Sequence, residues 1–251
     1  MKIIKATILV CLLCEFSLFA QNPLELQSVK RTRFALTSKY DSLANPKTVA
    51  LIERYKSQMA KQMNEVIGVA PMELAGGIPE SPLLNLTADV LREAGSKFTP
   101  TRVDLGLMND GGLRNTIRSG NVTVGNIFEV YPFDNQLVVL YIKGKDLRDL
   151  FGYIAKIGGA GVSGVTLKIK NGAIAELFIG ASELNDERIY TVATIDYLAD
   201  GNDGAIALKQ ATTRKYTGLL LRDVMMDFIK NSTKVGKAIE AKMDGRISIQ
   251  K

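Results

Sequence analysis

Histidine is missing from all 251 residues of the sequence, and tryptophan is missing as well. The absence of imidazole excludes Ser-His-Asp and Cys-His catalysis. It also excludes the usual zinc sites and most dinuclear metal sites, which depend on histidine ligands. Carboxylates alone can bind Mg²⁺ or Ca²⁺, but here they occur only as scattered pairs such as Asp200 and Asp203. We therefore expect no tight metal site in this chain.

Cysteine is nearly as scarce, since Cys11 and Cys14 are the only two. Both lie in residues 1–20, where a positive start, a short apolar run and a plausible cleavage site before Gln21 are typical of a secretory signal. We expect ordinary cleavage there and an exported protein, periplasmic or extracellular, without a membrane span. Lipidation at Cys14 is less favoured because Leu13 stands where a small side chain is preferred. The mature chain then has no thiol for catalysis and no disulfide.

Dense runs of one charge are absent too. The formal net charge is +6, and charged residues make up 23% of the sequence with both signs mixed along it. This pattern is typical of a solvated surface, and we expect no nucleic-acid partner. A mildly basic balance still favours the approach of small anions such as phosphates.

Apolar periodicity predicts helices and strands in mixed order. After a polar stretch at 25–39 that could contain a strand, helices are expected at 45–66, 81–95, 145–156 and 217–231, and strands at 102–107, 136–143, 165–179, 188–195 and 246–250. Ser81 and Thr217 are the expected N-caps, Gly95 the expected helix end, and Asn171-Gly172 the turn of a hairpin. No strict βαβ rhythm is present. We therefore predict an α+β fold with a mixed sheet flanked by helices, preceded by a long amphipathic helix.

The predicted helix at 45–66 has an apolar face of Val49, Ile52, Tyr55 and Met59 and a charged opposite face. One interpretation is that the apolar face packs on the main domain. The other is that the helix is a linker or a docking helix for a partner. The sequence leaves both open.

Three predicted loops each combine glycine, Asn or Asp with an aromatic or charged residue. The first spans Asn109 to Arg114 and contains Gly111 and Gly112, which allow a ligand close to the backbone. The second contains Phe133, and the third runs from Tyr197 to Asp203. Asn can bond a base or amide edge, Arg can bind anions or hydroxyls, and a carboxylate can accept from a diol. Each loop alone is weak evidence. Gly-Gly pairs usually form plain turns, and aromatic residues such as Phe133 and Tyr197 are more often part of the core than platforms for a ligand.

Together these loops resemble the C-terminal domain of the 5′-nucleotidase and UDP-sugar hydrolase family. The resemblance rests on four motifs in order, over about residues 66–251: Glu80-Ser-Pro-Leu-Leu-Asn-Leu86 with Asp89, Asn109-x-Gly-Gly-Leu-Arg114, Tyr131-Pro-Phe-x-Asn135, and Tyr197-Leu-Ala-x-Gly-x-Asp203-Gly. It implies a nucleotide-recognition domain.

The resemblance also implies roles for the loop residues. Phe133 and Tyr197 would stack on the two faces of the base, with Tyr replacing the commoner Phe at 197. Asn109 would bond near the base. Arg114 and Asp203 would hold the ribose or nearby oxygens, and Gly111 and Gly112 would allow close backbone approach. No catalytic residue is expected in this set.

Two features depart from the family pattern. An arginine that often precedes the Glu80 motif is replaced in that neighbourhood by Gly77, so one ligand contact is in doubt. The family's metallophosphatase domain does not fit in residues 21–65, which we expect to be an extension with a connector helix. The resemblance therefore implies divalent metals and hydrolase activity on a partner metallophosphatase, encoded separately, and no cofactor in this chain.

Three hypotheses follow. The first is a nucleotide-recognition component of 5′-nucleotide hydrolysis that acts with a separate metallophosphatase chain. The second is a stand-alone exported protein that binds nucleosides or nucleotides without catalysis. The third is a scaffold that kept the fold and lost the ligand.

Overall fold

The computed structural model describes residues 26–43 and 45–250, so the expected signal at residues 1–20 and the expected lipidation position Cys14 lie outside the described residues. Contacts divide the chain into two units, one up to Leu51 and one from Ile52 onward, and each is described by itself. Among the described helices, none combines the length and apolar character needed to cross a membrane.

The first unit contains little regular structure. Residues 26–37 form no helix or strand, and the 3-10 helix η1 follows at Ser38–Leu43. The strand that the stretch 25–39 could contain is therefore not formed in its described part. Its apolar side chains Val29, Phe34 and Leu36 are exposed. A strand at these residues would therefore have neither a pairing partner nor burial to stabilise it.

Helix α2 spans Pro46–Met63 and begins in the first unit. Asn45 caps it, because its side-chain oxygen accepts from the Lys47 amide at 2.9 Å. None of the helix residues is buried. The apolar face is open, with Ile52 and Tyr55 more than half exposed. Both interpretations of this helix, packing on the main domain and a linker or docking role, stay predictions.

The second unit is built on a five-stranded mixed sheet, as expected. Its strand order is β10 (Thr213–Leu220), β4 (Gln136–Lys143), β9 (Ile189–Ile195), β2 (Leu105–Met108) and β5 (Gly161–Ser163). Strands β2 and β9 run parallel, and the other neighbours run antiparallel. All four residues of β2 are buried. Since successive side chains point to opposite faces, the sheet is covered on both.

Helix α3 (Pro82–Ser96) lies against this sheet and begins after Ser81, as the sequence predicts. Gly95 does not end the helix, and this part of the prediction is wrong. It lies in the last turn, where a Cβ would come within 2.7 Å of the Ala193 Cβ. Glycine is thus required at 95 because the helix approaches strand β9 closely.

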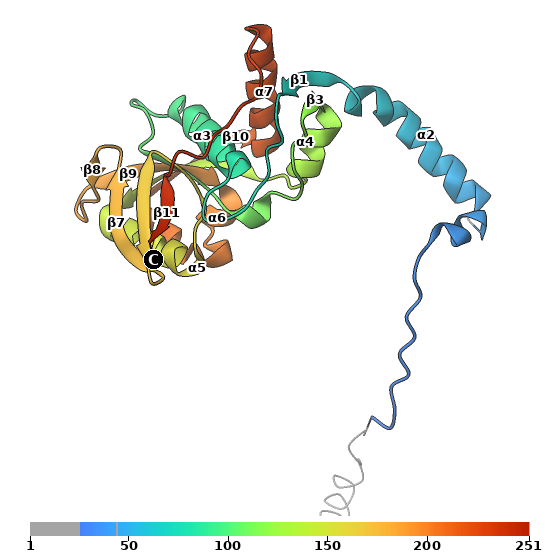
Figure 1. Cartoon of the computed structure of the whole chain (residues 1–251), viewed down its shortest axis with the longest axis horizontal. Coiled ribbons are helices and arrows are strands. Elements are labelled where there is room, and N and C mark those ends of the chain that lie inside the picture. The colour runs from blue at the N-terminus through green and yellow to red at the C-terminus, as the bar shows by residue number, and fades with distance from the viewer. Residues whose placement is uncertain (1–25, 44, 251) are drawn as a thin grey trace, which may run out of the picture. The chain divides into compact units, whose positions relative to one another are not determined.

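A second sheet has the order β11 (Ile247–Gln250), β6 (Val165–Lys170), β7 (Ala173–Ile179) and β8 (Ser182–Glu183). The β6–β7 hairpin turns at Asn171 and Gly172, which have φ of 51° and 72°. These are the left-handed values that a two-residue hairpin turn needs, so this prediction is confirmed. The C-terminal strand β11 pairs parallel to β6, and Figure 1 shows them side by side.

The stretch around Thr217 differs from the prediction. Residues Thr213–Leu220 form strand β10, and helix α7 begins only at Leu221 and runs to Lys234. Thr217 is not an N-cap: its hydroxyl donates to the Leu137 carbonyl at 2.8 Å. Residues of β10 form a strand because they pair with β4, although Thr217 followed by an apolar run favours the start of a helix locally. Helix α7 contacts α4 (Val124–Val130) and β1 (Val66–Ala70), and β1 pairs with β3 (Gly120–Thr123) (Figure 1).

The Glu80 motif ties the end of the chain to α3. A Glu80 side-chain oxygen accepts from the Asn85 amide and from the backbone N–H of Asp244, each at 2.7 Å. The Arg246 guanidinium donates to Asp89 at 2.9 Å. These motif residues therefore act structurally, because they hold the segment that leads into β11.

Candidate functional site

Strand register brings the three candidate loops to one edge of the sheet. Strands β2 and β9 are parallel, with Gly106 opposite Ala193, so the loops that follow them leave from the same edge. Strand β4 runs the other way and pairs Leu137 with Ile195. The loop that precedes β4 therefore reaches the edge where β9 ends. Candidate residues at 109–114, 133 and 197–203 thus gather there.

Asp203 joins two of these loops. Its Oδ2 accepts from Asn109 Nδ2 at 2.6 Å, and its Oδ1 accepts from the Tyr197 hydroxyl at 2.9 Å. Asn109 directly follows β2, Tyr197 lies in the short helix α6 (Asp196–Ala199) after β9, and Asp203 lies in η3 (Asn202–Gly204). Each carboxylate oxygen has two acceptor positions. One acceptor position on each oxygen of Asp203 therefore remains for a ligand with two adjacent hydroxyls.

The backbone at Asp203 has φ of 48°, in the left-handed region that Asp and Asn tolerate. This conformation turns the carboxylate toward Asn109 and Tyr197. The hydrogen bond to Asp203, together with its negative charge, raises the pKa of Tyr197 above its ordinary value of 10.0. Tyr197 is therefore a neutral donor over the physiological range. The residue is 41% exposed.

The Asn109 loop is a single 3-10 turn, η2, at Asp110–Gly112. A Cβ on Gly112 would come within 2.4 Å of Met108 Cε, so the Met108 side chain would have to move to accept one. A Cβ on Gly111 would lie 3.7 Å from Asp203 Oδ2, which places this backbone beside the carboxylate. Arg114 is exposed, and its Nη1 donates to the Gly111 carbonyl at 3.2 Å.

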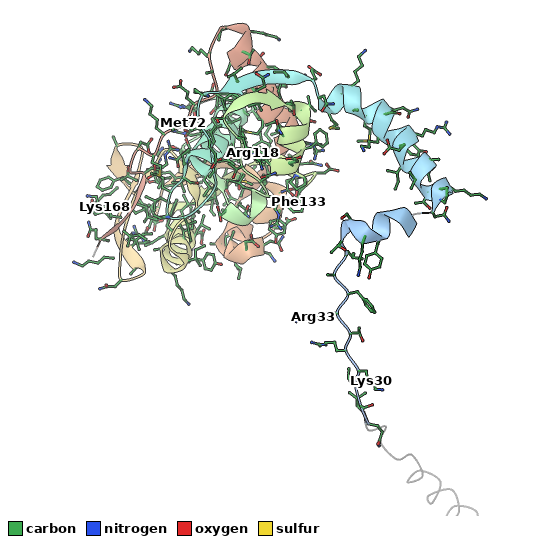
Figure 2. All side chains as sticks on the ribbon, turned by 45° about the vertical axis from the view of Figure 1, so that its right-hand side comes forward. Lys30, Arg33, Met72, Arg118, Phe133 and Lys168 are labelled. Carbon is green, nitrogen blue, oxygen red and sulfur yellow. The ribbon has the colours of Figure 1, made fainter. Side chains whose placement is uncertain are left out.

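Phe133 lies between α4 and β4 and is 47% exposed. Its ring therefore belongs to the surface rather than the core, as Figure 2 shows. A backbone bond from the Arg114 amide to the Val130 carbonyl, 3.0 Å long, connects its loop to the Asn109 loop. No contact of the Phe133 ring with Tyr197 is recorded among the described residues, so a sandwich of the two rings stays a prediction.

A cavity of about 300 Å³ opens beside the Asn109–Asp203 pair. Asn109, Gly111 and Asp203 contribute its polar lining, and helix α5 (Gly144–Ile157) contributes Leu150 and Tyr153. The Tyr153 ring packs closely on Gly204, where a Cβ would lie 2.0 Å from Cζ. The cavity is mainly apolar with a few polar groups in its lining, which is typical of a small-molecule site.

The donor set of the described residues does not fit a catalytic metal. No group of three or more Asp, Glu, Cys or His side chains gathers in residues 26–43 and 45–250. Asp203 instead bonds an amide and a phenol. No chemical step through a metal can be assigned to these side chains.

Two contributors to this region were not predicted from the sequence. Tyr153 lies on α5, where its helical spacing suggests only an amphipathic helix. Arg222 lies in the first turn of α7, yet its side chain is 10% exposed and contacts the Phe133 loop. Its one sequence signal is a charge directly after the apolar run Leu219-Leu220-Leu221.

The sequence model of the family described as "5′-nucleotidase, C-terminal domain" matches residues 66–210, which is more than half of the sequence. The chain belongs to this family, and both the resemblance and the predicted fold class are confirmed.

Individual relatives support the same assignment. The chain is 31% identical over 159 residues to the endonuclease YhcR of Bacillus subtilis, which covers 60% of this chain and 13% of that protein. It is 28% identical over 145 residues to a 5′-nucleotidase of Vibrio vulnificus, covering 56% of this chain and 26% of the relative.

A solved structure agrees with these relatives. The crystal structure of a 5′-nucleotidase precursor from Thermus thermophilus superposes with a TM-score of 0.71 at 28% identity, covering 81% of this chain and 43% of that one. The chain thus spans less than half the length of each of these three proteins.

Proposed function

We propose that this chain is an exported nucleotide-recognition component of 5′-nucleotide hydrolysis. The observation that carries the proposal is the gathering of Asn109, Tyr197 and Asp203 at one sheet edge through bonds of 2.6 and 2.9 Å. The site offers acceptors for a diol, exposed aromatic rings for a flat base, and an exposed arginine. Those are the groups that a nucleoside phosphate requires.

In this proposal the rings of Phe133 and Tyr197 take the two faces of the base, and Asn109 bonds near its edge. The free acceptor positions of Asp203 take the ribose hydroxyls. Arg114 has five N–H donors, of which one is recorded on Gly111. The others suit hydroxyl or phosphate oxygens.

Hydrolysis itself breaks the P–O bond between phosphate and nucleoside and adds water. The chain has no histidine, and its described carboxylates form no metal cluster. We therefore assign this step to a metallophosphatase on a separate chain, which would hold the divalent metals. The exposed apolar face of α2, including Ile52 and Tyr55, suits a docking role toward that partner.

The test combines binding with activity. Calorimetry of the purified chain with adenosine and AMP should give saturable binding, weakened about fivefold or more in Phe133→Ala, because base stacking contributes about 1–3 kcal/mol. A histidine-bearing metallophosphatase encoded beside this chain should release phosphate from AMP faster, or with lower KM, when the wild-type chain is added. The Phe133→Ala chain is the matched control for that addition.

The outcomes separate the alternatives. Binding without any effect on the phosphatase favours a stand-alone nucleotide-binding protein and refutes the two-component proposal. No binding of adenosine or AMP refutes both and favours a scaffold that lost its ligand.

A further inference from the structure

Arg222 is a buried arginine at the start of α7, next to the loop that carries Phe133. Its side chain is 10% exposed. Burial of a guanidinium is unfavourable unless its donors are paired. The partners of Arg222 therefore show what the residue holds.

The recorded polar partners of Arg222 all come from the Phe133 loop. Nη1 donates to the Tyr131 carbonyl at 3.2 Å, and Nη2 donates to Asp134 Oδ1 at 2.7 Å. The guanidinium carbon lies 4.2 Å from the centroid of the Phe128 ring, in cation–π contact at the end of α4. Nε has no hydrogen-bond partner among the described residues.

These contacts lie on both sides of Phe133. Tyr131 is two residues before it, and Asp134 directly follows it. The backbone of α7 adds a third contact, because the Leu221 amide donates to the Asn135 carbonyl at 2.8 Å. Tyr131 is itself fixed, since its buried hydroxyl lies 2.7 Å from the Thr87 hydroxyl. The first turn of α7 thus clamps the segment 131–135.

Phe133 has no polar anchor of its own among the described residues. The residue is 47% exposed, and no hydrogen bond or cation–π contact is recorded for its side chain among the described residues. The position from which the ring projects therefore depends on the backbone at 131–135. The Asp134 side chain is 76% exposed, so a carboxylate that could point into solvent is instead held against a buried cation.

We propose that Arg222 is a positioning residue for nucleotide recognition, which fixes the Phe133 loop so that the ring is presented to the base. The inference rests on the proposed function for the stacking role of Phe133. Arg222 acts through Phe133 and does not touch the ligand. Its loss should therefore matter only while the Phe133 ring is present.

The experiment uses the full chain with Arg222→Met, which keeps an unbranched apolar stem and removes the guanidinium with its charge. A second variant, Asp134→Asn, removes the ion pair from the exposed side and leaves the buried residue in place. Arg148→Met is the matched control, because Arg148 pairs with Asp186 elsewhere on the surface. Thermal melting verifies that each variant is folded.

The first readout is amide hydrogen exchange without ligand at the residues of 131–135 that carry an amide hydrogen, which excludes Pro132. Exchange should be faster in Arg222→Met and Asp134→Asn and unchanged in Arg148→Met. Arg222→Lys should be intermediate, because an ammonium reaches one of the two oxygens but lacks the fork of the guanidinium. Unchanged exchange in both Arg222→Met and Asp134→Asn overturns the clamp.

The second readout is AMP affinity in a double-mutant cycle with Phe133→Ala. Arg222→Met should weaken AMP about fivefold to tenfold in the wild-type background and have no effect in the Phe133→Ala background. Equal losses in both backgrounds overturn the proposal, because Arg222 would then act on the fold in general. A wild-type chain that binds no AMP refutes the proposed function, and the exchange readout still decides the clamp.

Discussion

Asn109 and Asp203 are 94 residues apart in the sequence, and Asn109 Nδ2 donates to Asp203 Oδ2 over 2.6 Å. This bond joins the loop after β2 to the turn beyond β9. It fixes the carboxylate in one orientation, with Oδ1 on the Tyr197 hydroxyl. In the proposed function, a ligand diol would therefore meet an acceptor pair that is already oriented.

Asp203→Asn should weaken adenosine binding by roughly ten- to a hundredfold, because a hydrogen bond to a charged group contributes about 1.5–3 kcal/mol. Calorimetry measures the change. The control ligand is 2′,3′-dideoxyadenosine, which lacks the diol and should bind both proteins equally. A variant that loses affinity for both nucleosides alike would contradict a role for Asp203 in diol binding.

Tyr197 should titrate later than an ordinary phenol, because its hydrogen bond to Asp203 raises its pKa above 10.0. The ultraviolet difference titration of wild type minus Tyr197→Phe isolates this phenol, and Asp203→Asn should return its midpoint toward 10.0. The folded state keeps the proton longer than the unfolded state. The stability contribution of this bond is therefore present below pH 10.0 and is lost as the pH rises through the folded pKa. A midpoint at or below 10.0 would contradict the contact.

Gly95→Ala should destabilise the chain by about 1–3 kcal/mol, although alanine favours helices, because the new Cβ overpacks against Ala193. Gly152→Ala is the matched control in helix α5, where nothing lies within 4 Å of the added Cβ. It should stabilise by about 0.5–1 kcal/mol. Urea unfolding measures both, and equal shifts would show that α3 does not approach β9 as closely as described.

Asp244 should make stability sensitive to acid. The hydrogen bond from Arg246 lowers the pKa of Asp244 below its ordinary value of 3.8. Its contribution is therefore present above about pH 3.8 and is lost as the pH falls through the folded pKa. Asp244→Asn should lower the free energy of unfolding at pH 7 and flatten its decline in this acid range. Urea titrations of both proteins at pH 7 and in the acid range test this, and parallel pH profiles would contradict it.

The sequence predicts those parts of the fold whose signals are local. Asn171-Gly172 specifies its hairpin turn, and the apolar run at Gln136–Lys143 forms β4 with the expected bounds. Thr217 misleads, because a Thr before Leu219-Leu220-Leu221 resembles a helix cap, whereas pairing of Tyr216 with Val138 places it in a strand. Long-range pairing is not visible in local periodicity.

The candidate site likewise contains residues that the sequence indicates and one residue that only the structure indicates. Asn109, Tyr197 and Asp203 lie in loops with recognisable residue types, and the structure brings them together. The contacts of Arg222 span 88 and 91 residues to Asp134 and Tyr131. Nothing near Arg222 in the sequence indicates these partners, so its role becomes visible only in three dimensions.

The parallel register of β2 and β9 determines whether a misfolded form of the chain can be recognised by ligand binding. A slip of two residues would keep every side chain on its own face of the sheet, and most probes of secondary structure would not detect it. The slip would, however, move Asn109 past Asp203 by about 7 Å, and the bond between them would be lost. Nucleoside binding should thus distinguish the native register from a well-packed form of the chain in which the register is shifted by two residues.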